Sequence, residues 1–233
     1  MISPEPAAAE ILHNCALAFA SEYQVDPDGE GVSLKSKSTQ LGFFHSFISG
    51  PFVLRARQPN QALLKACNNK KSNIENLLDL TAGWGVDSFT LAHHGQRVTL
   101  LEHHPLVFAI VAYSLGRLAD DSKADAIAQR LVIKQANAND YLQSPGAEHG
   151  FDCIYLDPMF PAHKSSAKPG KEMQILQAMT GNLDIDVAFA AALQKARKRV
   201  VVKRPAKAAT LGAAKPDLVY REKTIRFDVY LTA

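Results

Sequence analysis

The chain has 233 residues, of which 47% are hydrophobic and 21% charged, as expected for a water-soluble globular protein with one sizeable domain. No apolar run approaches the ~20 residues that a helix needs to cross a bilayer, and the first residues lack the basic start and apolar stretch of a signal peptide. These features exclude a membrane-spanning protein. Together with three widely spaced cysteines outside any Cys-x-x-Cys motif, they favour reduced thiols and a cytoplasmic location.

The net charge of +3 is distributed unevenly along the chain. Residues 1–160 carry 12 Lys and Arg against 17 Asp and Glu, whereas residues 161–233 carry 14 against 6. A one-sided basic excess is typical of proteins that bind a phosphate-rich partner. A lysine-rich surface that is merely solvated is the alternative explanation.

Residues 1–50 predict a small α+β appendage at the N-terminus. Within it, residues 7–20 have helix-forming composition and an apolar face, and the stretch 22–31, which contains Pro, Asp and Gly, predicts a turn. Residues 32–48 predict one or two short strands, and a further helix is expected at residues 60–67.

Strand-like and helix-like segments then alternate along the rest of the chain. Short apolar runs of the kind that is buried on both faces of a sheet occur at residues 77–81, 97–102, 131–135, 152–157 and 199–203. Helices are expected between them at residues 85–94, 104–119, 138–143 and 171–197, the last broken near Gly181. Two final strand-like runs, 217–221 and 224–231, predict a terminal hairpin. Residues 51–233 therefore predict an α/β domain with a doubly wound parallel sheet and a terminal antiparallel hairpin, which resembles the seven-stranded, Rossmann-like fold of class I methyltransferases.

The first strand of this sheet runs into a glycine turn, Thr81-Ala-Gly-Trp-Gly85. Ligands of open parallel sheets bind beyond the carboxyl ends of the strands, where the connectivity reverses, and Gly83 and Gly85 would lie at that point. Their missing side chains let the backbone turn tightly and approach a ligand closely. Asp79 would face the amino group of a bound amino-acid moiety, and Glu102, at the end of the second strand, would accept hydrogen bonds from both hydroxyls of a ribose.

The same features also suit a nicotinamide dinucleotide. Ser88 stands where the third glycine of Gly-x-Gly-x-x-Gly would be, which weakens that alternative without excluding it. A glycine turn that only packs a helix against a strand is the remaining explanation.

The fourth strand ends in an acidic-proline-aromatic turn, Asp157-Pro-Met-Phe-Pro161. Exocyclic base amines are poor nucleophiles, because the nitrogen lone pair is delocalised into the ring. The Asp157 carboxylate and the Pro158 carbonyl would accept the amine hydrogens and orient the nitrogen, and Phe160 would stack the base, an interaction worth ~1–3 kcal/mol. A simple strand-ending Asp-Pro turn is the alternative. A stacked, extruded base favours unpaired RNA as the substrate.

Basic residues follow this turn and also end the fifth strand. They are candidates to hold a nucleic-acid backbone: Lys164, Lys168, Lys171, Lys203 and Arg204. The adjacent pairs His93-His94 and His103-His104 are candidate metal ligands. However, no carboxylate or cysteine stands at the spacing that would complete a metal site. We therefore expect no metal.

The glycine turn and the acidic-proline turn, about 75 residues apart and in this order, favour an S-adenosylmethionine-dependent amino methyltransferase. The sequence further resembles the ribosomal RNA small subunit methyltransferase J family from about Ala62 to Tyr230. The resemblance is densest at Thr81-Ala-Gly-x-Gly, Val98-Thr-Leu-Leu-Glu102, Tyr155-Leu-Asp-Pro-Met-Phe-Pro161, Lys171-Glu-Met173, Val200-Val-Val-Lys-Arg-Pro205 and Arg226-Phe-Asp-Val-Tyr230.

This resemblance implies methylation of a guanine N2 in 16S rRNA, with the small ribosomal subunit as partner. It also implies S-adenosylmethionine contacts at Val86, Asp87, Glu102, His103, Asn137, Ala138 and Asp157. Val86 and His103 stand where the family usually has arginine, so any contacts there would come from the backbone or be weaker. A DNA or protein amino methyltransferase, a dinucleotide-dependent oxidoreductase and a noncatalytic RNA-binding module remain as alternatives.

Overall fold

A seven-stranded sheet forms the centre of the computed structural model, which describes residues 4–58, 60–68, 73–121, 124–144, 150–159, 169–181, 183–212 and 214–232. Its strand order is β6-β5-β4-β7-β8-β10-β9. The strands are β4 (Asn76–Asp79), β5 (Arg97–Glu102), β6 (Leu131–Gln135), β7 (Cys153–Leu156), β8 (Arg199–Pro205), β9 (Leu218–Arg221) and β10 (Ile225–Leu231). The first five are parallel, and β10 pairs antiparallel with both β8 and β9. The predicted doubly wound sheet with a terminal hairpin is confirmed.

Alternate residues of the central strands enter two different hydrophobic clusters, one on each face of the sheet. In β7, Tyr155 belongs to one cluster, whereas Ile154 and Leu156 belong to the other. This two-sided burial is why the strands read as continuous apolar runs. Helices α3 (Gln61–Cys67), α4 (Val86–His93), α5 (Pro105–Asp120) and α8 (Lys171–Met179) contribute to the first cluster; α7 (Ala138–Gln143) and α9 (Ile185–Lys195) contribute to the second.

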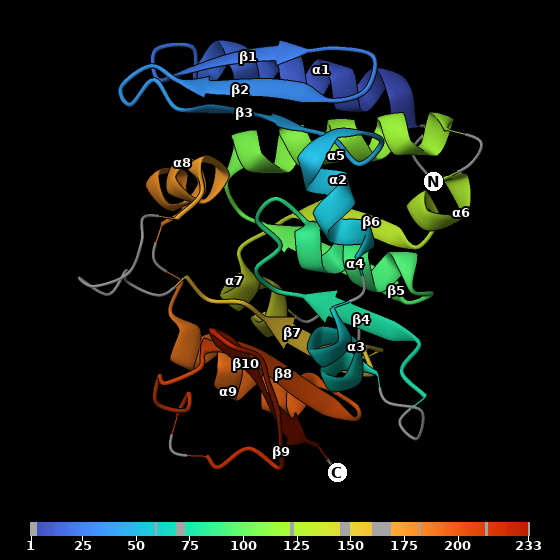
Figure 1. Cartoon of the computed structure of the whole chain (residues 1–233), viewed down its shortest axis with the longest axis vertical. Helices are drawn as coiled ribbons and strands as arrows, with labels where there is room; N and C mark the ends of the chain where they lie inside the picture. Colours follow the sequence, from blue (N-terminus) through green and yellow to red (C-terminus); the bar gives the residue numbers. More distant parts are fainter. Residues whose placement is uncertain are drawn as a thin grey trace.

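A three-stranded antiparallel sheet lies across the first face, next to α5 (Figure 1). It consists of β1 (Tyr23–Pro27), β2 (Val32–Ser36) and β3 (Gly42–His45), flanked by α1 (Pro4–Ala18) and α2 (Gly50–Arg57). Leu12 and Leu34 share one buried cluster with residues of the central sheet, so this N-terminal unit and the main sheet have a common core. The domain boundary at residue 50 stays a prediction.

One local prediction needs correction, and some elements were not predicted. The turn predicted at 22–31 is confined to residues 28–31, where the Asp28 carboxylate accepts hydrogen bonds from the N–H groups of Glu30 and Gly31, and the preceding residues form β1. Strand β1 was not predicted, because Tyr23 is the one buried residue in it and its sequence shows no clear alternation of apolar and polar residues. Helix α2 and the short α6 (Asp125–Ala128) were also not predicted. The expected break near Gly181 is confirmed, because α8 and α9 are separate helices.

His45 connects the N-terminal unit to the main sheet at one buried point. Its Nε2 lies 2.9 Å from the Trp84 carbonyl oxygen, and its Nδ1 lies 2.8 Å from Ser114 Oγ. Burial lowers the pKa of His45 to about 4, so the ring is neutral at physiological pH, with Nε2–H donating to the carbonyl. The N-terminal unit thereby anchors the turn that follows β4.

A buried ion pair holds the terminal hairpin against the end of β8. Arg226 donates from Nε to Asp228 Oδ1 at 2.8 Å and from Nη2 to Oδ2 at 2.9 Å, and both side chains are less than 10% exposed. Arg226 Nη1 also donates to the carbonyls of Pro205, Ala206 and Ala208. The pair therefore orders the loop after β8 as well as the hairpin. Within the described part of the chain, no helix is long and apolar enough to span a bilayer.

Replacing Asp228 with alanine would leave the Arg226 guanidinium buried without its carboxylate. We expect Asp228→Ala to lower the free energy of unfolding by about 3–5 kcal/mol, because the remaining charge loses its partner. Asp120→Ala is the matched control, because Asp120 pairs with Arg117 at 3.1 Å on a part-exposed face, where loss costs less than about 1 kcal/mol. Urea denaturation of the three proteins measures both values, and equal losses would contradict this account of the pair.

Candidate active site

The candidate site lies at the carboxyl ends of β4, β5, β7 and β8. The chain runs outward from β4 through β5 to β6 and then returns to β7 on the other side of β4, so the connectivity reverses between β4 and β7. Open α/β sheets bind ligands at such a switch point. Asp79, Glu102 and Lys203 end or nearly end their strands here, and Asp157 directly follows β7. The topology thus brings together side chains that are far apart in the sequence.

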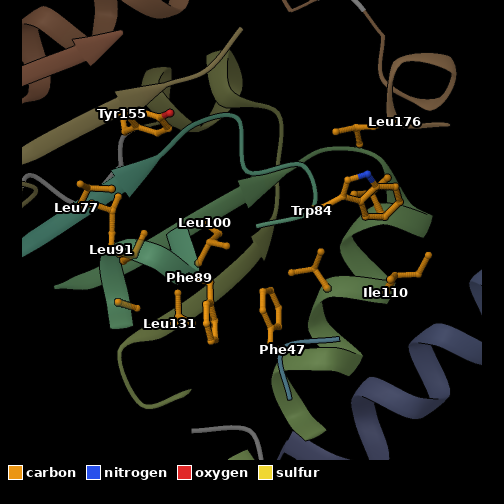
Figure 2. Close-up of a cluster of buried hydrophobic side chains, with 14 of the residues drawn as sticks. Phe47, Leu77, Trp84, Phe89, Leu91, Leu100, Ile110, Leu131, Tyr155 and Leu176 are labelled. Atoms are coloured by element: carbon orange, nitrogen blue, oxygen red, sulfur yellow. The ribbon is translucent and has the colours of Figure 1, made fainter. Parts of the chain in front are cut away.

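The predicted glycine turn after β4 has the backbone conformation that glycine favours. Gly83 has φ +51° and Gly85 has φ +75°. A Cβ at Gly83 would lie 2.8 Å from Leu176 Cδ2, and one at Gly85 would lie 3.2 Å from Phe47 Cζ. Figure 2 shows Leu176 beside Trp84 of this turn, and Phe47 beside Phe89. The turn therefore has no room for side chains at these two positions.

Glu102 holds the glycine turn against the end of β5. Its carboxylate is 4% exposed and accepts hydrogen bonds from the Gly83 N–H at 3.1 Å and from the His104 N–H at 2.7 Å. His103 Nδ1 lies 3.3 Å from the same carboxylate, and a hydrogen bond to Glu102 raises the pKa of His103. A carboxylate offers about four lone-pair positions, so Glu102 keeps acceptor capacity for ligand hydroxyls.

Asp79 is buried at the end of β4 and is 2% exposed. Its Oδ2 accepts from Ser88 Oγ at 2.6 Å, and its Oδ1 accepts from the Thr81 N–H at 3.0 Å. Burial raises the pKa of Asp79 to about 7; the two hydrogen bonds oppose this rise, and the charges of Asp87 and Asp157 add to it. The carboxyl group is thus close to half protonated near neutral pH and would ionise fully beside a cation.

Four polar side chains form a connected network next to Asp79. Lys203 Nζ donates to Asp87 Oδ2 at 2.9 Å and to Asp157 Oδ2 at 2.8 Å, and the Tyr155 hydroxyl donates to Asp87 Oδ2 at 2.6 Å. Burial raises the pKa of Asp87, but Lys203 and Tyr155 outweigh it, so the pKa is lowered overall. For Asp157, burial outweighs the attraction of Lys203, and the pKa is raised. The two carboxylates therefore have pKa values shifted in opposite directions.

The backbone of the acidic-proline turn is also fixed. The Asp157 N–H donates to Thr81 Oγ1 at 2.7 Å, which ties the end of β7 to the turn after β4. Thr180 Oγ1 lies 3.6 Å from Met159 Sδ, so the segment after α8 contacts this turn. Asp157 therefore lies beside the glycine turn, and the Thr81 side chain connects the two.

The other predicted site residues lie in different surroundings. Val86 is the first residue of α4, Asn137 caps α7 by accepting from the N–H groups of Asn139 and Asp140, and Ala138 is buried. Lys171 is exposed at the start of α8, whereas Arg204 is 9% exposed and donates to the Ala209 carbonyl. Predicted residues outside the described part of the chain are Phe160, Lys164 and Lys168.

Several site residues were missed by the sequence analysis. Thr81, Ser88 and Tyr155 hold the carboxylates of the site, and Glu172 accepts a hydrogen bond from Trp84 Nε1 at 2.9 Å through its backbone carbonyl. Lys203 was assigned to a nucleic-acid backbone, yet its ammonium lies between two carboxylates. One pattern pointed to Tyr155: it stands two residues before Asp157 in a strand, and so on the same face. Among the described residues, no group of three His, Cys, Asp or Glu is placed to hold a metal ion.

Comparisons with known proteins agree with this geometry. Residues 16–232 match a family described as "Putative SAM-dependent methyltransferase". The crystal structure of a SAM-dependent methyltransferase from Neisseria gonorrhoeae superposes with a TM-score of 0.67 at 27% identity, covering 99% of this chain and 93% of that one.

Two relatives are named ribosomal RNA small subunit methyltransferase J. The protein from Nitrosococcus oceani is 37% identical over 81% of this chain and 76% of its own length. The protein from Aeromonas salmonicida is 42% identical over 74% of this chain and 70% of its own length. On this similarity, this chain belongs to the ribosomal RNA small subunit methyltransferase J family of S-adenosylmethionine-dependent enzymes.

Proposed function

We propose that the protein transfers the methyl group of S-adenosylmethionine to the exocyclic N2 of a guanine in 16S rRNA of the small ribosomal subunit, in the cytoplasm. The observation that carries the proposal is the position of Asp157. Its carboxylate follows β7, beside the glycine turn, with one oxygen hydrogen-bonded to Lys203 and its N–H bonded to Thr81. The names of the relatives support ribosomal RNA as the substrate.

The residues present fit the cofactor. The positive φ angles of Gly83 and Gly85 leave bare backbone at the switch point, Glu102 keeps lone pairs for ribose hydroxyls, and Asp79 would ionise beside the methionine ammonium. When bound, the cofactor supplies an electrophilic methyl group on a sulfonium. Asn137 and Ala138 at the start of α7, Val86, Asp87 and His103 would complete its surroundings.

The chain's own contribution is to orient the guanine amine. Asp157 would accept a hydrogen bond from N2–H, and the Pro158 carbonyl would accept the other amine hydrogen. Phe160 would stack the base, and the two acceptors together would aim the nitrogen lone pair at the methyl group. Lys164, Lys168 and Lys171 would contact the RNA backbone, consistent with the basic excess of the C-terminal third.

The direct test uses methyl-labelled S-adenosylmethionine and small ribosomal subunits from cells that lack this activity. After digestion of the RNA, label in N2-methylguanosine is the expected result. Matched reactions with DNA and with ribosomal proteins are included. Label in those acceptors, or in another nucleoside, would contradict the proposed substrate, and failure to bind the cofactor would contradict the whole proposal.

Asp157→Ala should lower kcat by on the order of 100-fold or more, because the substrate amine loses its charged acceptor. Asp157→Asn keeps an amide oxygen that can accept, so its loss should be smaller. Measured on the same proteins, cofactor affinity should fall by a smaller factor than kcat, and the unfolding midpoint should stay close to that of the wild type. Near-normal turnover of Asp157→Ala would remove this residue from the mechanism.

Cofactor affinity should depend on pH through Asp79. The pKa of about 7 in the free protein falls when a cation binds, so binding below pH 7 must release the Asp79 proton. Affinity should therefore weaken as pH drops from about 7 to 5.5, by up to about tenfold per pH unit. Calorimetry in two buffers of different ionisation enthalpy would measure both the affinity and the proton release.

Asp79→Asn should bind more weakly and lose most of this pH dependence. A hydrogen bond to Glu102 raises the pKa of the nearby His103, so His103→Gln serves as the control that keeps Asp79 intact. A wild-type affinity that is flat between pH 5.5 and 7.5 would show that Asp79 does not face the cofactor's cation.

Phe160→Ala should raise KM for the RNA substrate more than it weakens cofactor binding. Loss of one stacked base costs ~1–3 kcal/mol, which corresponds to about 5- to 150-fold in affinity. Phe160→Tyr keeps the ring and is the matched control. Equal effects of Phe160→Ala on RNA and cofactor would indicate packing instead of stacking.

A further inference from the structure

Lys203 lies in the candidate site as the partner of two carboxylates. Its Nζ is 2.8 Å from Asp157 Oδ2 and 2.9 Å from Asp87 Oδ2, and the three side chains are 22%, 32% and 20% exposed. The Tyr155 hydroxyl donates to the same oxygen of Asp87. Two of the three N–H donors of the ammonium are thus committed to carboxylates. A lysine that binds an RNA phosphate would instead present its ammonium to the solvent side.

We infer that Lys203 is a positioning residue for methyl transfer: its ammonium fixes Oδ2 of Asp157, so that Oδ1 accepts from the substrate amine. This inference rests on the proposed function of Asp157. The Lys203 contact leaves Oδ1 as the oxygen available to a ligand, since Oδ2 already accepts from the ammonium. A single fixed oxygen also restricts rotation of the carboxylate, which orients the remaining lone pairs.

The charges around Asp157 explain why a cation is needed there. Asp87 approaches from α4 and Asp79 from β4, and the Tyr155 hydroxyl approaches from β7. Burial raises the pKa of Asp157, Lys203 lowers it, and Asp87 raises it again. A protonated Asp157 would donate a hydrogen bond where the substrate amine also donates. Lys203, from β8, opposes that protonation.

The same arrangement accounts for the proton of the reaction. Transfer of the methyl group to N2 would leave the carbon–sulfur electron pair on sulfur and would require N2 to release one proton. The Asp157 carboxylate would accept that proton and pass it to solvent, since its side chain is 32% exposed. Lys203 and Asp87 would keep their opposite charges throughout the reaction, so the net charge of this pair would not change.

Lys203→Met removes the ammonium and keeps the length of the side chain. We expect kcat to fall by about 100-fold, because Asp157 loses its orientation. We also expect the acidic limb of the kcat–pH profile to move upward by about 1 to 3 pH units, because an opposite charge no longer favours the carboxylate. Lys65→Met, at an exposed position of α3, is the matched control and should change neither quantity.

A second measurement needs no RNA. The ¹³C chemical shift of the Asp157 carboxyl, assigned with Asp157→Asn, should titrate at a higher pH in Lys203→Met than in the wild type. Lys203→Arg keeps the charge, so its titration and its pH limb should stay near those of the wild type while kcat falls through altered geometry. If Lys203→Met does not fold, Lys203→Arg provides the test. A shift in the acidic limb of its kcat–pH profile would overturn the inference.

An RNA-phosphate contact would produce a different pattern. In that case Lys203→Met would raise KM for RNA and reduce the salt dependence by about one phosphate contact, with kcat and the Asp157 titration unchanged, and the inference would be wrong. Failure of the proposed function is distinguishable, because the wild-type protein would then leave guanine N2 unlabelled whatever the Asp157 titration shows.

Discussion

The site gathers four carboxylates at the carboxyl ends of the parallel strands: Asp79 and Glu102 are buried, and Asp87 and Asp157 are partly exposed. A buried carboxylate without donors would cost several kcal/mol or take up a proton. Each of the four therefore accepts hydrogen bonds that the fold supplies. Backbone N–H groups meet Glu102, hydroxyl groups meet Asp79 and Asp87, and one lysine meets Asp87 and Asp157. Without these donors, four carboxylates could not lie so close together at the strand ends.

The Gly83 N–H that donates to Glu102 belongs to the left-handed turn after β4, and distant segments hold this turn. His45 of the N-terminal unit donates to the Trp84 carbonyl, and the Trp84 indole donates to the Glu172 carbonyl of α8. Arg55 of α2 pairs with the Glu172 side chain at 2.7 Å. These contacts reach Trp84 directly or through Glu172, so the N-terminal unit and α8 both support the glycine turn.

The sequence predicted the sheet and the acidic strand ends well, because both follow from local patterns. Short apolar runs mark strands buried on two faces, and Asp79, Glu102 and Asp157 each stand at the end of such a run. Strand β1 was missed because its exposed residues show no alternation that a prediction can use. The environment of Lys203 was missed for a different reason. A count of charges over residues 161–233 shows that the segment is basic. It does not show that one of its lysines, Lys203, pairs with Asp87 of α4 and with Asp157 after β7.

Asp79 and Asp157 are two carboxylates of the same site that are suited to different tasks. Asp79 is met by donors that carry no charge, so burial dominates and its pKa reaches about 7, which makes it ready to ionise when a cation arrives. Asp157 has a lysine beside it, which lowers its pKa against the larger effect of burial. Pairs of titratable groups whose surroundings differ in this way usually divide the work of a site. Here the division follows from topology: β8 delivers its lysine to Asp157 and Asp87, whereas β4 lies one strand further away, where Asp79 has Ser88 and Thr81 as its partners. The order of the strands thus determines which of the two carboxylates lies beside the lysine.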